Sequence, residues 1–202
     1  MVCAGGTGGH VMPAISVYET LKERGHKVFF VTDPRGARYT QSISADDLLV
    51  LPIVRHKGAL GLIPYTLSLL INTLKAFLWL RQQQATCVVS FGGYVAFPMN
   101  MAAVLRGCPL VLHEQNAILG RVNRLFSRFS RVLALSFLGA VQNLSEKARS
   151  QVVVTGVPVR QSIVRQQRQG YIAPLGQELI YILVLGGSQG AEIFSQVVPK
   201  AL

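Results

Sequence analysis

The chain has 202 residues, half of them hydrophobic and only 14% charged, so it is long and apolar enough to bury a sizeable core. This composition excludes an intrinsically disordered protein. Lysine and arginine total 20 against 9 aspartate and glutamate residues, a net charge of +11. Such an excess favours an anionic partner: nucleotide phosphates, nucleic acid or an acidic lipid surface.

The three cysteines, Cys3, Cys87 and Cys108, are odd in number, widely spaced and set in apolar runs. They indicate buried thiols in a reducing cytoplasm, because small secreted domains use paired cysteines. No Cys/His cluster has metal-ligand spacing, so we expect neither a metal nor a cofactor. The chain opens directly on an apolar run without a secretory signal, which predicts that a few residues are missing before Met1.

The first ten residues predict a short strand over Val2–Ala4, a loop with four glycines, and a helix over Val11–Arg24 that ends at Gly25. Glycines let backbone N–H groups approach an anion, and the helix N-terminus adds the positive end of its dipole. His10, at the mouth of this loop, is placed to take a proton from a bound group. The ordinary alternative is a tight turn with a surface histidine.

Apolar runs alternate with helical patterns along the rest of the first domain. Strands are predicted over Lys27–Thr32, Leu48–Val54, Thr86–Phe91, Pro109–His113, Arg131–Leu135 and Val152–Thr155. Helices are predicted over Tyr65–Gln82, Phe97–Leu105 and Leu119–Phe129. This alternation indicates an α/β fold, a Rossmann-like doubly wound parallel sheet. Ligands of such sheets bind beyond the C-terminal ends of the strands, where the glycine loops of this chain fall.

Polar residues with Gly and Pro over 166–178 predict a linker after a first domain of residues 1–165. A strand over Leu179–Leu185, the loop GGSQG (186–190) and a helix then open a second domain, 179–202. One strand and one helix cannot form a domain. We therefore expect one complete domain and the start of a second, with the remainder absent.

The two glycine loops share one layout, which suggests two Rossmann-like domains that face each other across a cleft. A dinucleotide fingerprint fits poorly, because Val11 stands where G-x-G-x-x-G needs its third glycine. Asp33, at the end of the second predicted strand, is the one residue that suits a ribose contact. A dinucleotide-binding oxidoreductase therefore remains an alternative.

Five motifs occur in order: GGTGGHVMPAISV, FGGYVAFP, VLHEQNAILG, TGVPVR and VLGGSQGA. Together they resemble the MurG family of GT-B glycosyltransferases. The resemblance implies an inverting enzyme without a metal-binding motif. It would move N-acetylglucosamine from UDP-N-acetylglucosamine (UDP-GlcNAc) to the muramyl 4-hydroxyl of lipid I, undecaprenyl-diphospho-muramoylpentapeptide, giving lipid II for peptidoglycan synthesis.

In that family the N-terminal domain takes the acceptor and the C-terminal domain holds most of the UDP-sugar site. The resemblance thus implies that this chain is mainly the acceptor half and is inactive alone. The alternative of a different class is a non-catalytic module that binds lipid diphosphates and membranes.

The motifs also imply roles for particular residues. His10 would be the catalytic base. Acceptor contacts would be Gly6, Gly92, Gly93, Tyr94, His113, Glu114 and Gln115. Donor contacts would be Thr7, Gly8, Gly9, Asn116, Arg160, Ser188, Gln189 and Gly190. Of these, Thr7, Gly8 and Gly9 would line the cleft by the acceptor diphosphate as well as by the donor sugar. From the residues alone, a packing role for Tyr94 and a core role for His113 remain open. The run Gly156-Val157-Pro158 departs from the family, which usually has an asparagine there.

A mostly apolar stretch, Ala59–Leu80, is long enough to be considered as a transmembrane span. Pro64, Asn72 and Lys75 interrupt it, and it lies between two predicted strands. We therefore expect a helix that lies on the membrane surface, the ordinary alternative being a core-packed crossover helix. The residues expected at the membrane are Leu70, Leu74, Lys75, Phe77, Trp79, Arg121, Arg124 and Arg128.

Arg121, Arg124, Arg128 and Arg131 are three and four residues apart, which predicts one arginine face on a helix. Val122, Leu125, Phe126 and Phe129 are expected to point the other way. Glu114 is the one acidic residue between Leu48 and Ser145, so the arginines favour anionic headgroups. Nucleic acid fits poorly, since no recognition motif is present. The resemblance implies a peripheral protein on the cytoplasmic face of the bacterial inner membrane, with other wall-synthesis proteins as further partners.

Overall fold

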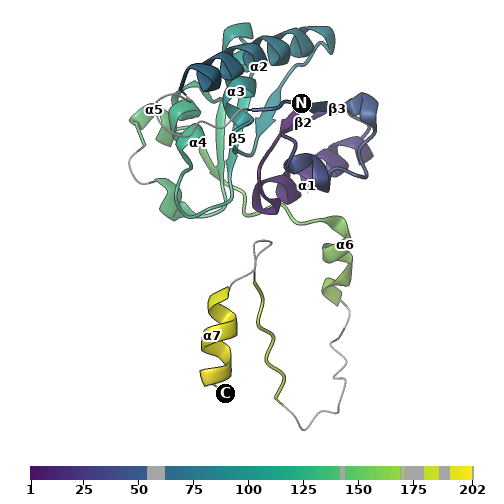
Figure 1. Cartoon of the computed structure of the whole chain (residues 1–202), viewed down its shortest axis with the longest axis vertical. Helices are drawn as coiled ribbons and strands as arrows, with labels where there is room; N and C mark the ends of the chain where they lie inside the picture. Colours follow the sequence, from purple (N-terminus) through teal and green to yellow (C-terminus); the bar gives the residue numbers. More distant parts are fainter. Residues whose placement is uncertain (54–61, 142–143, 169, 171–179, 187–191, 202) are drawn as a thin grey trace. The chain divides into compact units, whose positions relative to one another are not determined.

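The computed structural model describes residues 1–53, 62–141, 144–168, 170, 180–186 and 192–201. The chain divides into two compact units, Met1–Arg160 and Gln161–Leu202. All seven strands of the described chain lie in the first unit (Figure 1). Each unit is described by itself below.

The first unit is built on a parallel sheet. Its strands are β1 (Val2–Cys3), β2 (Phe30–Thr32), β3 (Leu48–Val50), β4 (Val88–Ser90), β5 (Leu110–Glu114), β6 (Val132–Leu135) and β7 (Val152–Val154). The strand order is β3-β2-β1-β4-β5-β6-β7, and every neighbouring pair is parallel. This confirms the predicted Rossmann-like fold. The order runs outward from β1 on one side and from β4 on the other, so the topological switch point, where ligands of such sheets bind, lies between β1 and β4.

Helices cover both faces of this sheet. They are α1 (Gly8–Glu23), α2 (Leu62–Gln82), α3 (Ala96–Arg106), α4 (Arg121–Phe126) and α5 (Glu146–Arg149). Short 3-10 helices occupy Gly36–Tyr39, Ala45–Asp47, Ser127–Phe129 and Leu138–Val141. Helix α1 begins at Gly8 rather than at the expected Val11, because the Thr7 carbonyl already accepts the N–H groups of His10 and Val11. His10 therefore lies in the first helical turn.

Alternate residues of β1 enter two separate cores. Val2 packs with α1 residues such as Val11 and Ile15, whereas Cys3 packs with Met99 of α3 and other residues on the opposite face. This alternation follows from the pleat of a strand. Both faces are thus buried, as the continuous apolar runs predicted. Burial also raises the pKa of the Cys3 thiol far above its usual value.

Helix α2 buries a mainly small and polar side and exposes most of its leucines. The buried side chains are Ser68, Asn72, Ala76 and Leu80. Asn72 Nδ2 donates to the Pro52 carbonyl at 3.0 Å and to the Ser68 carbonyl at 2.8 Å. The exposed apolar residues are Leu62, Ile63, Leu67, Leu70, Ile71, Leu74 and Leu78. By length and composition alone α2 could cross a membrane, with a mean hydropathy of 1.3, but this is weak evidence.

The residues of α2 that were expected at a membrane separate into two groups. Leu70, Leu74 and Lys75 are exposed. Phe77 and Trp79 are half-buried and pack against the core. The indole ring of Trp79 meets Phe29 edge-on, with ring centroids 5.4 Å apart, so its position serves packing.

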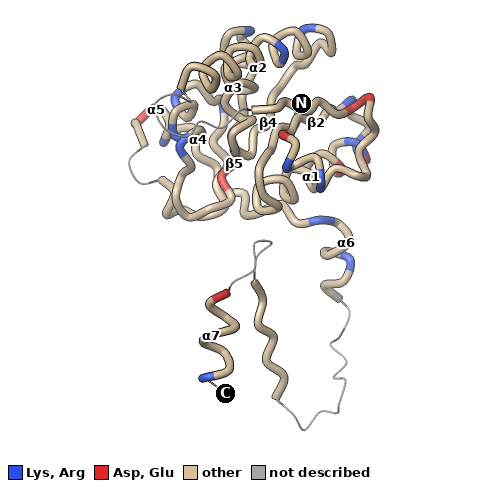
Figure 2. Tube along the Cα trace, viewed as in Figure 1, with Lys and Arg blue, Asp and Glu red and all other residues tan. Residues whose placement is uncertain are grey.

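The expected four-arginine face on one helix is wrong. The α-helix ends at Phe126, and a 3-10 helix follows. Ser127 Oγ donates to the Arg124 carbonyl and Ser130 Oγ to the Ser127 carbonyl, and such side-chain bonds compete with a continuing helix. All four arginines are exposed, and basic residues gather around α4 and α5 (Figure 2). Leu125 and Phe129, expected on the opposite side, are also about half-exposed.

The second unit contains α6 (Gln161–Val164), a 3-10 helix (Arg165–Arg168) and α7 (Glu192–Ala201). The predicted strand over Leu179–Leu185 is not formed: residues 180–186 have no regular secondary structure, and Leu179 lies outside the described residues. A strand needs a hydrogen-bonded neighbour, and the described part of this unit supplies none. Most of the predicted linker lies outside the described residues. Ser188, Gln189 and Gly190 also lie outside them.

Candidate functional site

Two glycine loops meet at the switch point of the sheet. One follows β1 at Gly5 and Gly6, and the other follows β4 at Gly92 and Gly93. Gly93 has a φ of +87°, and a Cβ atom on it would lie 2.5 Å from the Gly5 carbonyl oxygen. The two backbones are therefore in direct contact, which only glycine at position 93 allows. The sequence placed both loops at strand ends, but their contact is a finding of the structure.

A pocket of about 250 Å³ opens beside these loops. Its lining residues are His10, Gly92, Gly93, Tyr94, Glu114, Gly120, Arg121, Val122 and Asn123. It thus brings the predicted base together with four of the predicted acceptor contacts. The remaining predicted residues lie outside this lining: Gly6, Thr7, Gly8 and Gly9 at the start of α1, His113, Gln115 and Asn116 around the end of β5, and Arg160 exposed at the end of the first unit.

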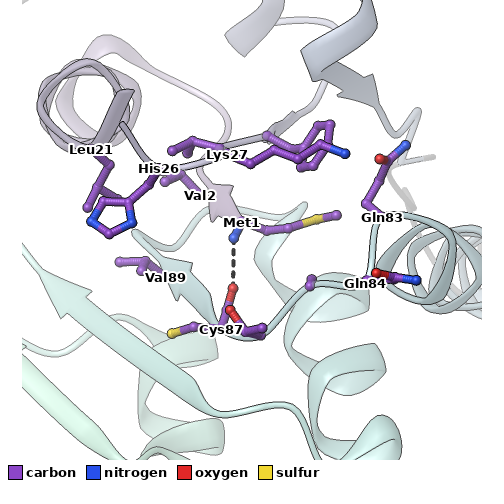
Figure 3. Close-up of a pocket in the computed structure, with 13 residues that line it drawn as sticks. Met1, Val2, Leu21, His26, Lys27, Gln83, Gln84, Cys87 and Val89 are labelled. Atoms are coloured by element: carbon purple, nitrogen blue, oxygen red, sulfur yellow. Dashed lines mark hydrogen bonds between the residues drawn. The ribbon is translucent and has the colours of Figure 1, made fainter. Parts of the chain in front are cut away.

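A larger hollow of about 510 Å³ lies near the N-terminal ends of β1, β2 and β4. Figure 3 shows it around Met1, whose amino group donates to the Cys87 carbonyl at 2.7 Å. Its lining includes Val2 of β1, Val89 of β4 and Phe29, which directly precedes β2. Ligands of doubly wound sheets bind beyond the C-terminal ends of the strands instead. The smaller pocket is therefore the candidate site.

The His10 imidazole packs against the second glycine loop. A Cβ atom on Gly92 would lie 3.2 Å from His10 Cδ2 and 3.5 Å from Nε2. Burial lowers the pKa of His10; Glu114 and Asp33 act to raise this pKa, and Arg35 acts to lower it. A histidine with a lowered pKa is neutral near pH 7 and can accept a proton. Its position and its charge state both fit a general base.

Glu114 is 1% exposed and organises the loop after β5. Its Oε1 accepts the backbone N–H of Asn116 at 3.1 Å and the Asn116 side-chain amide at 2.9 Å. Its Oε2 accepts the Gly120 N–H at 2.8 Å and Asn123 Nδ2 at 3.0 Å. Both oxygens are thus engaged by the protein, and the carboxylate fixes the wall of the pocket.

His113 is buried at 4% exposure, and the core role left open by the sequence fits its surroundings. Its Nε2 lies 3.1 Å from the Gly156 carbonyl, and its ring stacks on Phe91 with centroids 4.8 Å apart. Burial lowers the pKa of His113, against the opposing effect of the Gly156 hydrogen bond. A neutral ring that donates from Nε2 ties β5 to the loop after β7.

Sequence reasoning missed the part of the pocket that α4 supplies. Asn123 Nδ2 donates to the His113 carbonyl and to Glu114 Oε2, both at 3.0 Å. An asparagine between the apolar residues Val122 and Phe126 was the available signal, because buried amides need partners. Arg121, expected at the membrane, lines the pocket as well.

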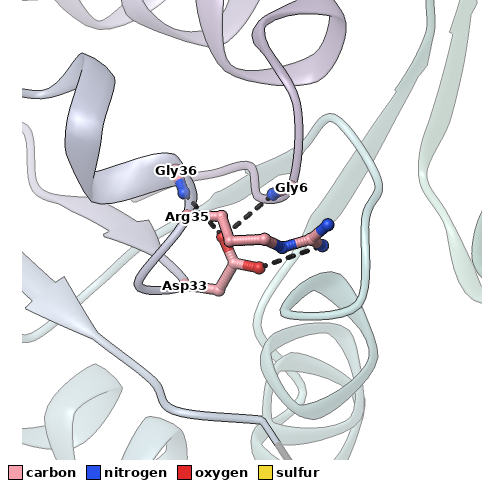
Figure 4. A network of polar contacts seen from close by, with 4 residues as sticks. All are labelled: Gly6, Asp33, Arg35 and Gly36. Atoms are coloured by element: carbon pink, nitrogen blue, oxygen red, sulfur yellow. Dashed lines mark hydrogen bonds and ion pairs between the residues drawn. The ribbon is translucent and has the colours of Figure 1, made fainter. Parts of the chain in front are cut away.

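Asp33 is 5% exposed and serves the glycine loop. Figure 4 shows its Oδ1 accepting the backbone N–H groups of Gly6 at 2.9 Å and Gly36 at 2.8 Å. Its Oδ2 faces Arg35 at 3.4 Å. Both oxygens are occupied, which counts against the ribose contact of a dinucleotide-binding protein. Among the described residues, no group of three or more His, Cys, Asp or Glu could hold a metal ion.

Comparison with known proteins places the chain in a family. The glycosyltransferase family 28 N-terminal domain matches residues 1–134. The chain belongs to this family. It is 40% identical to a Rhodospirillum centenum protein and 38% identical to one from Paramagnetospirillum magneticum, each named UDP-N-acetylglucosamine–N-acetylmuramyl-(pentapeptide) pyrophosphoryl-undecaprenol N-acetylglucosamine transferase. All of this chain is covered in both matches, against 53% and 54% of those proteins, so it spans about half the length of these relatives.

A solved structure agrees with this assignment. The crystal structure of Acinetobacter baumannii MurG matches with a TM-score of 0.66 and 29% identity, over 85% of this chain and 49% of that one. The chain is thus a homologue of MurG. A UDP-N-acetylglucosamine 2-epimerase from Rickettsia bellii, with a TM-score of 0.56 and 16% identity, shares the fold alone.

Proposed function

We propose that this chain supplies the acceptor-binding half of a MurG-type glycosyltransferase. The activity is transfer of N-acetylglucosamine from UDP-GlcNAc to the muramyl 4-hydroxyl of lipid I, which gives lipid II and releases UDP. The observation that carries the proposal is the pocket at the switch point, where a histidine with a lowered pKa faces two touching glycine loops. Family membership and the names of the relatives support the same reaction.

The reaction needs a base and a site for the acceptor. The 4-hydroxyl oxygen forms the new bond to the anomeric carbon while the bond to the UDP oxygen breaks with inversion. His10 takes the hydroxyl proton. The acceptor diphosphate lies at the start of α1, where the N–H groups of Gly8 and Gly9 belong to the first helical turn and attract anions. The wall fixed by Glu114 and Asn123 holds the sugar against Gly92 and Gly93.

The acceptor carries a long lipid, so the protein has to work at a membrane. The exposed leucines of α2 offer an apolar surface that a soluble monomer rarely leaves uncovered. Lys75, Arg121, Arg124 and Arg128 are exposed cations suited to anionic headgroups. We infer a peripheral protein on the cytoplasmic face of the inner membrane, with Leu70 and Leu74 in the lipid.

The UDP-sugar site is not assembled in this chain alone. In the second unit the described apolar side chains remain exposed, for example Ile180 at 91% and Leu183 at 80%. Helix α7 buries none of its residues. The described residues of this unit thus form no packed core on which a donor site could be built. We therefore expect acceptor binding without turnover.

Calorimetric titration of the 202-residue chain tests this proposal, with a short-chain soluble analogue of lipid I and with UDP-GlcNAc separately. The expected result is saturable binding of the acceptor and little or none of the donor. His10→Gln should leave acceptor binding largely intact, because a base acts on the proton rather than on affinity. A folded sample that binds neither ligand would overturn the proposal. Saturable binding of a nicotinamide dinucleotide would favour the oxidoreductase alternative instead.

A further inference from the structure

Arg35 borders the first glycine loop, and neither the motifs nor the proposed reaction has given it a role. It lies in the turn between β2 and the 3-10 helix Gly36–Tyr39. Its side chain is 40% exposed. Among the described residues, its one recorded ion-pair partner is Asp33, with Nη2 and Oδ2 3.4 Å apart. That separation exceeds the distance of about 2.7–2.9 Å typical of strong charge-assisted pairs.

The guanidinium group reaches over Gly6. A Cβ atom on Gly6 would lie 3.3 Å from Arg35 Nη2, and Gly6 has a φ of +90°. Figure 4 shows the side chain extending past the Asp33 carboxylate on the side of Gly6. The positive charge of Arg35 is also close enough to His10 to act on the pKa of that histidine. The guanidinium therefore lies against the first glycine loop, within electrostatic reach of the proposed base.

In the part of the chain that the structure describes, only Asp33 accepts a hydrogen bond from this guanidinium. Arginine offers five N–H donors in a planar fork. The contact to Asp33 engages one of them at long range, while Asp33 Oδ1 is occupied by two backbone N–H groups. A planar fork matches two phosphate oxygens at once, and two linked phosphates offer such pairs with more charge than one phosphate. Asp33 holds the arginine at the loop without neutralising it through a bidentate pair.

We propose that Arg35 binds the diphosphate of the lipid-linked acceptor, with Asp33 as the positioning residue that holds both Arg35 and the Gly6 loop. This inference rests on the proposed function, because it assumes that the acceptor diphosphate lies at the start of α1. Arg35 then contacts the ligand beside the N–H groups of Gly8 and Gly9. A purely structural Arg35 would only offset the buried charge of Asp33.

The test compares two short-chain analogues of lipid I in calorimetric titrations of the 202-residue chain, one with a diphosphate and one with a monophosphate. The variants are Arg35→Ala and Arg35→Lys. Arg38→Ala is the matched control, since Arg38 is exposed in the 3-10 helix that directly follows Arg35. Loss of a charge-assisted pair predicts that Arg35→Ala weakens diphosphate binding about tenfold. The monophosphate analogue should lose much less, Arg35→Lys should fall between, and Arg38→Ala should match the wild type.

Further measurements distinguish a failure of the proposed function from a failure of the Arg35 assignment. Binding of the diphosphate analogue to the wild-type chain tests the proposed function, and its absence would overturn both proposals. With wild-type binding present, equal losses for the two analogues, or no loss, would overturn the assignment of Arg35 alone. UDP-GlcNAc is the other source of a diphosphate, so it is titrated as well. Weaker binding of UDP-GlcNAc to Arg35→Ala, with unchanged binding of the acceptor analogue, would also overturn the assignment of Arg35 to the acceptor. Trp79 fluorescence shows whether each variant is folded. If Arg35→Ala is unfolded, Arg35→Lys, which keeps the charge beside Asp33, replaces it in the comparison.

Discussion

Substitution of Gly93 by alanine tests whether contact between the two glycine loops constrains the fold. The new Cβ atom would lie 2.5 Å from the Gly5 carbonyl oxygen and 3.0 Å from the Gly5 carbonyl carbon. A left-handed backbone costs a residue with a side chain about 1 to 2 kcal/mol. Forcing an atom against fixed neighbours adds about 1 to 3 kcal/mol. We therefore expect Gly93→Ala to lose about 2 to 5 kcal/mol of unfolding free energy.

Gly25→Ala is the matched control, because Gly25 has a similar φ of +81° and a Cβ atom on it would meet no other atom within 4 Å. It should lose only the backbone contribution, about 1 to 2 kcal/mol. Urea unfolding followed by Trp79 fluorescence measures both variants. Trp79 is the single tryptophan of the chain and packs against Phe29, so it reports on the first unit. Equal losses for the two variants would refute the argument, since the close approach would then contribute nothing.

Three other variants test the loop after β5, the proposed base and the surface of α2. Glu114→Gln puts an amide donor among the N–H groups from which Glu114 accepts hydrogen bonds. The free energy of unfolding should therefore fall by about 1 to 3 kcal/mol in the same urea assay. An unchanged unfolding midpoint would contradict this account of the loop. Burial lowers the pKa of His10 below its ordinary value of 6.5, so the unfolded chain binds its proton more readily. The His10 contribution to the free energy of unfolding should therefore decline as the pH falls below 6.5 and be level above it. His10→Gln should reduce the slope of unfolding free energy against pH in this range. An unaltered slope would exclude His10 as its cause. In sedimentation with anionic vesicles, the double variant Leu70→Ser, Leu74→Ser should weaken binding about a hundredfold or more, because each buried leucine contributes about 1.5 to 3 kcal/mol. Ile118→Ser, at an exposed residue outside α2, serves as the control. Equal binding by the wild type and both variants would exclude α2 as the membrane surface.

The sheet could be predicted from the sequence because its strands are apolar runs, and the inner ones are buried on both faces. The strand Leu110–Glu114 lies within one residue of its expected range. The bounds of β2 and β3 were predicted less well, because β2 begins at Phe30 rather than Lys27 and β3 ends at Val50 rather than Val54. Helix ends were harder to predict, because side chains decide them locally. Ser127 and Ser130 bond to nearby carbonyls and end α4 early, although the apolar spacing continues.

The roles of the polar site residues could be predicted only in part. Asp33, His113 and Glu114 all follow or end buried strands, which marks them as site residues in a parallel sheet. What each one bonds to depends on residues far away in the chain. His113 reaches Gly156, and Asp33 reaches back to Gly6. The pattern therefore located the site but could not distinguish residues that support it from those that face a ligand.

The place of β1 in the interior of the sheet has a consequence during synthesis. Its neighbours are β2 and β4, and the main-chain bond beside β4 joins Met1 to Cys87, 86 residues further on. At about 5 to 20 residues per second, a ribosome takes roughly 4 to 17 s to deliver that partner. For this interval the growing chain holds a two-sided apolar strand with one edge unpaired, the kind of surface that other nascent chains and chaperones recognise. The same topology that brings the glycine loops together thus delays their contact until Gly93 has been made, and Glu114 and α4 complete the pocket only after that.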